Sequence, residues 1–356
     1  MALHAVILAG GAGERFWPAS RADHPKPLLE VVDGRSLLEA THRRARRFAS
    51  QGCVWVVCGR SHAAAIRRET GLPARRVLVE PQRRNTAMAI AWVAHHIAAQ
   101  DPEAVLAVLP ADHRIPDAGA FASAIRKGAK AARSARCMVT LGVKPSRPDT
   151  GYGYIKVGAP VGRSNPGLRR VERFVEKPDA AKARAYLRRG GYLWNAGIFV
   201  LGARTLLHEL EVCAPEIHRA LSPLARRPTA RSGAALEKAY RRAPSLPIDT
   251  AVMERSENVW TLPVPFHWSD VGTWLSLAEE LGVAPGETRV LGGELLSDDV
   301  GGNLVWGADR PIALLGVEGL AVIDTGDVLL VTQLDRSPDV RSVVAGLKKK
   351  GRRELT

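Results

Sequence analysis

The sequence predicts an α/β protein with a mixed, mostly parallel sheet, followed by a small all-β domain. Through the first half of the chain, short apolar runs alternate with amphipathic segments, which is the pattern of β-α-β units. After about residue 283 the helix signals disappear and short alternating runs take over. The length of 356 residues is enough for one large domain with a buried core and a smaller one.

The first half supplies the parallel part of the sheet. Ser36 and Glu39 fit a capping box at the start of the first helix. Segment 86–100 has apolar residues around much of its circumference, so we expect a largely buried helix. Right-handed crossovers bring the carboxyl ends of parallel strands to one edge, where ligands bind. The strands expected here are 3–9, 53–58, 76–80, 104–109 and 137–143.

The second half has a mixed pattern. We expect a catalytic domain over 1–282 and a small domain over 283–356, which contains strands within 283–335 and a short helix at 338–350. The Pro/Gly-rich stretches 158–167 and 283–293 are the best linker candidates. The elements expected between residues 150 and 215 are strands 152–157, 170–176 and 196–201 and helices 179–190 and 203–211.

Composition indicates a cytoplasmic protein without membrane association. No apolar run approaches the roughly 18–20 residues that span a bilayer. The N-terminal sequence MALHAVILAGG lacks a basic n-region and predicts a buried strand, not a signal peptide. None of the four cysteines belongs to a C-x-x-C pair, so we interpret them as reduced core residues: Cys53, Cys58, Cys137 and Cys213.

The net charge of +15 has two interpretations. A basic cleft would attract nucleoside triphosphates and sugar phosphates, whereas a basic face could bind nucleic acid. The arginine pairs are scattered over the polar sides of the expected helices, and an aromatic content of 5% leaves little material for base stacking. We therefore expect solvated helix faces and no nucleic-acid partner.

A glycine-rich loop follows the first strand. Gly10, Gly11 and Gly13 allow backbone N–H groups to approach a phosphate or a base edge, and Arg15 adds a fixed charge. A dinucleotide-binding fingerprint needs a further glycine where Phe16 stands, and a Walker A loop needs a Gly-Lys-Ser/Thr end that is absent. A plain tight turn remains the alternative.

Lys26 stands between Pro25 and Pro27. Each proline fixes its own φ and restrains the residue before it, so the lysine is carried on a stiff backbone. This arrangement suits a point charge aimed at a phosphate. The alternative is an exposed loop lysine.

The stretch GGAGERFWPASRADHPKPLL resembles the signature of sugar-nucleotide pyrophosphorylases, and its Arg-Phe-Trp-Pro segment is similar to the mannose-1-phosphate guanylyltransferase branch. The resemblance covers about residues 3–280, and 283–335 weakly resembles the family's short β-helix-like domain. Further segments that agree in order and spacing are EPQRRNTA (80–87), LPADH (109–113), TGYGYI (150–155), FVEKP (174–178), LWNAGIF (193–199), IDTAVME (248–254) and WSDVGTW (268–274).

This resemblance implies a Rossmann-like catalytic domain and a reaction. Mannose 1-phosphate would attack the α-phosphorus of GTP with Mg²⁺ as cofactor, giving GDP-mannose and pyrophosphate, in a homo-oligomer for which a dimer is favoured. Pro27 stands where this branch often has Gln, and the Pro-Lys-Pro form also occurs in relatives that use other nucleotides. A sibling enzyme with another base or sugar and a non-catalytic protein of the same fold therefore remain alternatives.

Some roles can be argued from chemistry. Asp112 follows strand 104–109, so its carboxylate is expected at the carboxyl end of the sheet, where it suits Mg²⁺; a helix N-cap or turn Asp is the alternative. Glu176 can accept bonds from sugar hydroxyls while Lys177 meets the phosphate. Neighbours on a strand point to opposite faces, so both can serve one ligand only at a strand end or bulge, which Pro178 favours.

The resemblance completes the expected site. It gives Asp270 as the second metal carboxylate beside Asp112, and we assign His113 no proton-transfer role. The catalytic residues implied are Arg15, Lys26, Asp112, Lys177 and Asp270. The nucleotide-binding residues implied are Leu8, Ala9, Gly10, Gly11, Gly13, Glu80, Arg84, Asn85, Thr86, Ala87 and Pro110. The sugar-phosphate-binding residues implied are Gly151, Tyr152, Gly153, Glu176, Lys177, Asn195 and Gly197.

Overall fold

The computed structural model describes residues 2–11, 13–32, 34–224, 233–307 and 310–356, so Ala12 of the glycine-rich loop lies outside the described residues. Its centre is a nine-stranded sheet in the order β5-β4-β1-β6-β10-β7-β11-β9-β8. The strands are β1 (Leu3–Ala9), β4 (Val54–Gly59), β5 (Val77–Glu80), β6 (Val105–Pro110), β7 (Met138–Val143), β8 (Tyr154–Pro160), β9 (Arg169–Val175), β10 (Tyr192–Gly202) and β11 (Val259–Val264).

The sheet is mixed, as predicted. Strands β5, β4, β1 and β6 are parallel, with Ile7 opposite both Val56 and Leu109. Strand β10 then inserts antiparallel between β6 and β7, and β11 pairs parallel to β7. Because β8 and β9 pair antiparallel, stretch 158–167 comprises the end of β8 and most of the connection to β9 inside the same sheet. The linker prediction for it was wrong.

Helices cover both faces of the sheet, so each face has its own core. One core contains Leu38, Ile66 and Phe121, and the other contains Trp92 and Tyr240. Ser36 caps α1 by accepting a 3.0 Å bond from the Glu39 backbone N–H, as the sequence indicated. The first core is covered by α1 (Leu37–Ala45), α2 (Ala63–Thr70) and α4 (Ala118–Ala135), and the second by α3 (Asn85–Ala98), α6 (Ala203–Cys213), α7 (Pro215–Ala220) and α8 (Ala234–Arg242).

The small domain is wound as a β-helix. Successive strands alternate between two sheets and pair parallel within each, as β12-β14-β16 in one and β13-β15 in the other, and β17 closes the larger sheet antiparallel. Its strands are β12 (Thr288–Leu291), β13 (Leu295–Asp298), β14 (Asn303–Trp306), β15 (Ile312–Leu315), β16 (Leu320–Asp324) and β17 (Leu329–Gln333). Because β12 lies inside 283–293, that linker prediction was too long.

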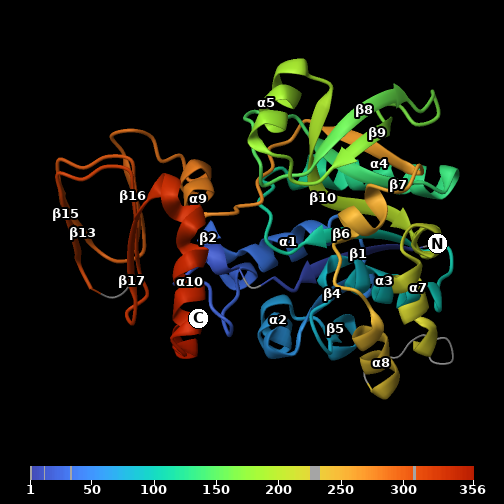
Figure 1. Cartoon of the computed structure of the whole chain (residues 1–356), viewed down its shortest axis with the longest axis horizontal. Helices are drawn as coiled ribbons and strands as arrows, with labels where there is room; N and C mark the ends of the chain where they lie inside the picture. The colour runs from blue at the N-terminus through green and yellow to red at the C-terminus, as the bar shows by residue number, and fades with distance from the viewer. Residues whose placement is uncertain (1, 12, 33, 225–232, 308–309) are drawn as a thin grey trace.

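The C-terminal helix braces the glycine-rich loop. Figure 1 shows α9 (Trp274–Glu280) and α10 (Val340–Lys349) between the sheet domain and the β-helix. Trp17, just after the loop, packs with Val340 and Val344 of α10, and its indole N–H donates to the Leu355 carbonyl at 2.6 Å. The start of the catalytic domain is therefore fixed by the end of the chain.

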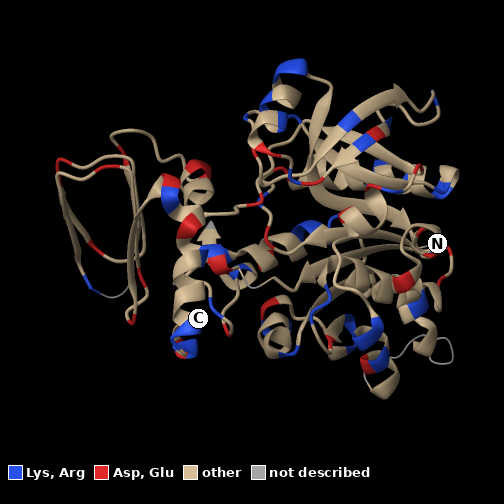
Figure 2. Ribbon diagram, in the orientation of Figure 1, with Lys and Arg blue, Asp and Glu red and all other residues tan. Residues whose placement is uncertain are grey.

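The four cysteines are free thiols; Cys58 and Cys137 are buried in the core as predicted, whereas Cys53 and Cys213 are only partly buried. None of the helices in the described residues is long and apolar enough to cross a bilayer. Figure 2 shows Lys and Arg on α5 (Ala180–Arg189), on α8 and at the C-terminal end of α10, which lie in different parts of the molecule. This scatter favours solvated helix faces over one basic face.

Candidate active site

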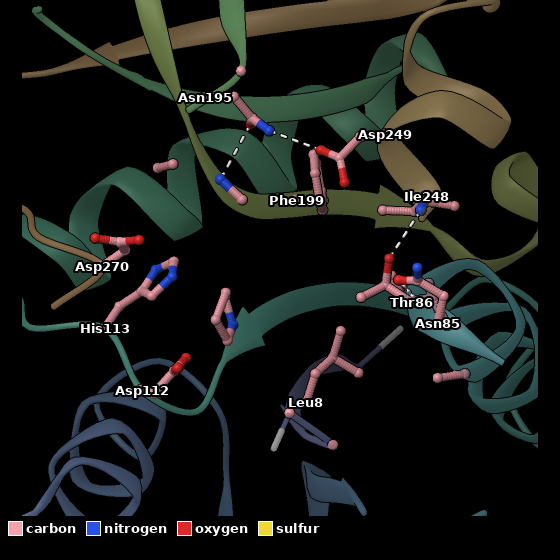
Figure 3. A pocket seen from close by; sticks show the side chains of 18 of the residues that line it. Leu8, Asn85, Thr86, Asp112, His113, Asn195, Phe199, Ile248, Asp249 and Asp270 are labelled. Carbon is pink, nitrogen blue, oxygen red and sulfur yellow. Dashed lines mark hydrogen bonds between the residues drawn. The ribbon is translucent and has the colours of Figure 1, made fainter. Parts of the chain in front are cut away.

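A cavity of about 580 Å³ opens at the carboxyl ends of β1, β5 and β6. Leu8, Glu80 and Pro110, which lie at the ends of these strands, all line it. Figure 3 shows Asp112, His113 and Asp270 toward one end of the cavity and Asn85, Thr86 and Ile248 toward the other. The parallel strands thus place the expected motifs around one space, as the crossover rule predicts.

At one end of the cavity, Lys26 connects its own motif to those of Asp112 and Asp270. Its backbone lies in a short 3₁₀ turn after Pro25, and the residue is only 6% exposed. The Nζ atom donates to Asp112 Oδ2 and to the Asp270 carbonyl, each at 2.7 Å. Burial, the largest single effect, raises the pKa of Asp112, but the charge and hydrogen bond of Lys26, together with smaller effects of neighbouring groups, hold that pKa below its usual value. The exposed-loop alternative for Lys26 is therefore wrong.

The Asp270 carboxylate has two polar neighbours. The Tyr152 hydroxyl donates to Asp270 Oδ1 at 2.9 Å. Burial, and then the Asp270 charge, raises the pKa of Tyr152 well above its usual range, so this hydroxyl keeps its proton. A Cβ on Gly272 would lie 2.8 Å from Asp270 Oδ2 and 3.2 Å from Arg15 Nη1. The Arg15 guanidinium therefore lies near the carboxylate, although Arg15 does not line the cavity itself.

His113 has a structural role here. Its Nδ1 accepts a 3.1 Å bond from the Trp268 indole N–H, and the two rings meet edge to face. Burial lowers the pKa of His113 to about 4, against the raising effect of Asp112 and Asp270. The ring is neutral at pH 7 and its Nδ1 is occupied, which agrees with the absence of a proton-transfer role.

A polar group suited to sugar hydroxyls lies deeper in the cavity. Asn195 Nδ2 donates to Asp249 Oδ1 at 2.8 Å, while Asn195 Oδ1 accepts from the Thr140 hydroxyl at 2.9 Å and the Gly197 N–H at 3.1 Å. Burial, and then the nearby Glu176 charge, raises the pKa of Asp249 to about 6. Sequence reasoning quoted the motif that contains Asp249 but did not select this residue.

The strand-end prediction for Glu176 and Lys177 is confirmed. Strand β9 ends at Val175, and Lys177 adopts a left-handed φ of 43°, so both residues line the same cavity. A Cβ on Gly153 would lie 2.7 Å from Glu176 Oε2, so a side chain at this position would displace the Glu176 carboxylate. The exposed Lys177 ammonium pairs with Glu176 Oε1.

The opposite end is built around the start of α3. Asn85, with φ 60°, bonds the Thr86 N–H through Oδ1 at 2.8 Å, and Thr86 Oγ1 accepts from the Ile248 N–H at 2.9 Å. The guanidinium of Arg84 donates from Nε to the Tyr240 carbonyl at 2.8 Å. Arg84 therefore fixes α8 against the cavity wall.

Glu80 lies beneath the glycine-rich loop. Its Oε2 would lie 3.5 Å from a Cβ on Gly10. Burial raises the pKa of Glu80 to about 7, although the Tyr240 hydroxyl and Arg83 act in the other direction. The Glu80 carboxyl can therefore gain or lose its proton near neutral pH.

Most expected site residues line the cavity. The exceptions are Arg15, already described, and the side chains of Ala9 and Ala87, which are buried in the two cores. Apolar wall residues were missed because nothing in their local sequence separates them from core. The lining residues absent from the sequence prediction are Pro27, Val57, Arg83, Ala89, Ile90, His113, Ala196, Phe199, Ser245, Ile248, Asp249 and Trp268.

The described residues contain no group of three or more His, Cys, Asp or Glu that could hold a metal ion by itself. Asp112 and Asp270 are the two carboxylates at the Lys26 end of the cavity. A cation bound there would need further oxygen ligands from a substrate.

Comparison with known proteins agrees with this site. Residues 4–282 match the nucleotidyl transferase family, and residues 293–347 match the MannoseP isomerase/GMP-like beta-helix domain. The xanthan biosynthesis protein XanB of Xanthomonas campestris pv. campestris (strain B100) is 38% identical, over 99% of this chain and 74% of the relative. The mannose-1-phosphate guanylyltransferase RfbM of Salmonella typhimurium is 35% identical, over 98% of this chain and 73% of the relative.

A solved structure is also similar over almost the whole chain. It is described as mannose-1-phosphate geranyltransferase from Thermus thermophilus, is 38% identical, and superposes with a TM-score of 0.88 over 98% of this chain and 100% of that one. These findings confirm the resemblance seen in the motifs and the two-domain fold. The chain is an enzyme of the nucleotidyl transferase family, of the type that acts on sugar 1-phosphates.

Proposed function

We propose that this enzyme transfers the guanylyl group of GTP to mannose 1-phosphate, giving GDP-mannose and pyrophosphate. The observation that carries the proposal is that the Lys26 ammonium bonds both the Asp112 carboxylate and the Asp270 carbonyl. The same cavity is lined by Asn195 and Asp249, the polar pair suited to sugar hydroxyls. The name of the relative RfbM supports the choice of guanine and mannose.

The reaction needs no general base. A phosphate monoester has a second pKa of about 6, so mannose 1-phosphate is mostly dianionic at pH 7. Its oxygen forms a bond to the α-phosphorus of GTP, the bond from that phosphorus to the bridging oxygen breaks, and pyrophosphate leaves with the electron pair. The task of the site is to align two polyanions and offset their repulsion. The neutral His113 fits this scheme because no proton has to be removed.

The chain's own residues divide the work. Lys26, buried and fixed by two hydrogen bonds, offers a preorganised positive charge to the phosphates. Arg15 lies near the Asp270 carboxylate and adds a second cation. Glu176, Asn195 and Asp249 present carboxylate and amide groups to the sugar hydroxyls.

Mg²⁺ fits the donor set at the Lys26 end. Hard divalent cations bind through one or two carboxylates plus phosphate oxygens, and Asp112 and Asp270 supply two carboxylates. Lys26 bonds Oδ2 of the Asp112 carboxylate, and Tyr152 bonds Oδ1 of the Asp270 carboxylate. Bound Mg²⁺ would neutralise phosphate charge and polarise the phosphoryl group.

Four nucleoside triphosphates tested against mannose, glucose and N-acetylglucosamine 1-phosphates would test the proposal. We expect pyrophosphate release to be fastest with GTP and mannose 1-phosphate. A preference for UTP or dTTP would assign the chain to a sibling activity and would point to Pro27, which lines the cavity, as a specificity residue. The dimer stays a prediction, which analytical ultracentrifugation would test.

A further inference from the structure

A second pocket, of about 280 Å³, lies between α1 and the segment that follows Asp112. Figure 1 shows α1 beside the carboxyl end of β6, and Thr41 of α1 donates to the Ala111 carbonyl at 3.2 Å. No Asp or Glu is among the described residues that line this pocket. Five arginines do line it: Arg35, Arg43, Arg44, Arg47 and Arg114.

Arg44 is the buried member of this arginine pocket. It is 7% exposed, and its Nη2 donates to Thr41 Oγ1 at 2.7 Å and to the His113 carbonyl at 2.8 Å. Its Nε is buried without a hydrogen-bond partner, and no ion pair reaches it from the described residues. Burial lowers the pKa of Arg44 only to about 10, so the group stays charged at neutral pH. A buried charge without a counter-charge is destabilising.

The surrounding charges leave the pocket positive. Glu39 Oε1 forms ion pairs with Nε of Arg35, at 3.8 Å, and with Nε of Arg43, at 2.9 Å. Arg114 pairs with a glutamate of α9 at 2.6 Å. Arg47 is exposed and forms no ion pair within the described residues. Two carboxylates thus pair with three of the five guanidinium groups, and Arg44 and Arg47 have no ion pair within the described residues, so a bound anion would complete the charge balance.

We propose that the arginine pocket binds a small phosphate-bearing anion and that this binding regulates the catalytic cavity. Guanidinium groups match phosphate oxygens with planar pairs of N–H donors, and a phosphate monoester carries nearly two negative charges. Several convergent arginines therefore suit a phosphate better than a single carboxylate.

The wall between the two cavities gives the regulation a physical route. His113 lines both of them and directly follows Asp112. Arg114 exchanges two backbone hydrogen bonds with Ser269, at 2.9 and 3.1 Å, one residue before Asp270. An anion that draws Arg44 and Arg114 toward it would bias the segments that carry both carboxylates. This regulatory half rests on the proposed function, whereas the binding half does not.

Thermal unfolding with inorganic phosphate, at constant ionic strength balanced by chloride, tests the binding. We expect a saturable rise of the unfolding midpoint in the unmodified chain, because a ligand that binds the folded state stabilises it. Arg44→Gln and Arg47→Gln should each raise the apparent Kd for phosphate at least ~10-fold, on the scale of a lost charged hydrogen bond. Arg47→Gln alters an exposed side chain, so folding does not limit the test.

Two control variants separate the pockets. Lys26→Ala removes the ammonium of the catalytic cavity and should keep the saturable rise, as should Arg68→Gln on the exposed face of α2. The proposal is overturned if the unmodified chain shows no saturable rise. It is equally overturned if Lys26→Ala abolishes the rise while Arg47→Gln keeps it, since phosphate would then bind only in the catalytic cavity.

A second arm identifies the source of the phosphate and tests regulation. Glucose 6-phosphate carries the same group on a sugar but not at the anomeric carbon, and stronger binding than inorganic phosphate would indicate a phosphorylated metabolite. Either anion should change KM or kcat of the unmodified enzyme. The same anion should leave KM and kcat of Arg47→Gln unchanged. Without added anion, the unmodified enzyme and Arg47→Gln should have equal rates. Binding without any change in rate would overturn the regulatory half. If no triphosphate is turned over at all, the proposed function fails while the unfolding assay still tests the pocket.

Discussion

Lys26 Nζ donates a 2.7 Å hydrogen bond to Asp112 Oδ2 across 86 positions of sequence. The same ammonium reaches the Asp270 carbonyl, so three separate motifs meet at one buried cation. The ammonium offsets the negative charge of Asp112 and fixes the backbone that carries the Asp270 carboxylate. This end of the cavity is therefore held together by contacts within the chain itself.

Replacing Lys26 should abolish most activity. In Lys26→Ala the preorganised charge is lost, and we expect kcat to fall at least ~100-fold, on the scale of losing one electrostatic donor. Lys26→Arg should rescue poorly, because a planar fork does not fit the place of a compact ammonium. Steady-state pyrophosphate release measures both. Lys156→Ala, which removes an exposed lysine paired with Glu172, should be near normal. Near-normal turnover in Lys26→Ala would contradict the assignment.

The two carboxylates should act as one unit. Asp112→Asn and Asp270→Asn are each expected to lose most activity with the fold retained, and the double variant should be little worse than the worse single, because groups that act together are not additive. EDTA should abolish turnover, and excess Mg²⁺ should restore it. Kinetics at saturating Mg²⁺ and circular dichroism check these outcomes. Losses that multiply would mean independent roles and no shared cation.

Gly153→Ala should affect the sugar side selectively. The new Cβ would lie 2.7 Å from Glu176 Oε2, so that carboxylate must move away from the sugar hydroxyls. We expect KM for mannose 1-phosphate to rise roughly tenfold, the scale of one or two lost hydrogen bonds, with KM for GTP unchanged. Gly59→Ala is the matched control, because a Cβ there meets nothing within 4 Å and it does not line the cavity. An equal change in both KM values would contradict this role for Gly153.

Asp249 should make the free enzyme less stable as pH rises. Its pKa is about 6 in the folded chain, against a usual value of 3.8, so the folded state binds more protons between these values. The resulting stabilisation is fully present below about pH 4 and is lost as pH rises through about 6. Asp249→Asn should therefore gain on the order of 3 kcal/mol relative to the unmodified chain above about pH 6.5, and nothing below about pH 4.

Urea unfolding of both chains at several pH values measures this difference. The amide can still accept the bond from Asn195 Nδ2, so the packing is conserved in the variant. Parallel stability curves from about pH 4 to 7 would show that Asp249 does not titrate in this range.

Much of the site could be predicted because its chemistry is local in sequence. The glycine-rich loop, the Lys26 segment and the strand-end position of Glu176 and Lys177 each depend on a few neighbouring residues, and each is found as expected. The first strand also agrees in its bounds, Leu3–Ala9, because its apolar run stops at two consecutive glycines, Gly10 and Gly11.

Other roles depend on distant partners. Arg84, which was expected at the nucleotide, lines the cavity, and the bond from its guanidinium to the backbone of α8, 156 positions away, could not be read from the sequence. Asp249 becomes part of the site only because Asn195 and Glu176 come beside it. The insertion of β10 between β6 and β7 is a similar case, since no local pattern specifies an antiparallel neighbour.

The sequence by itself determined the α/β fold class, the family and the residues with phosphate and carboxylate chemistry, because periodicity, glycine placement and motif spacing are properties of neighbouring residues. Only the tertiary structure decided which charges are balanced. Lys26 and Arg44 are both buried cations, but Lys26 lies against a carboxylate and Arg44 does not. That difference arises from which segments pack together, since the energy of a buried charge is set by partners far away in the chain.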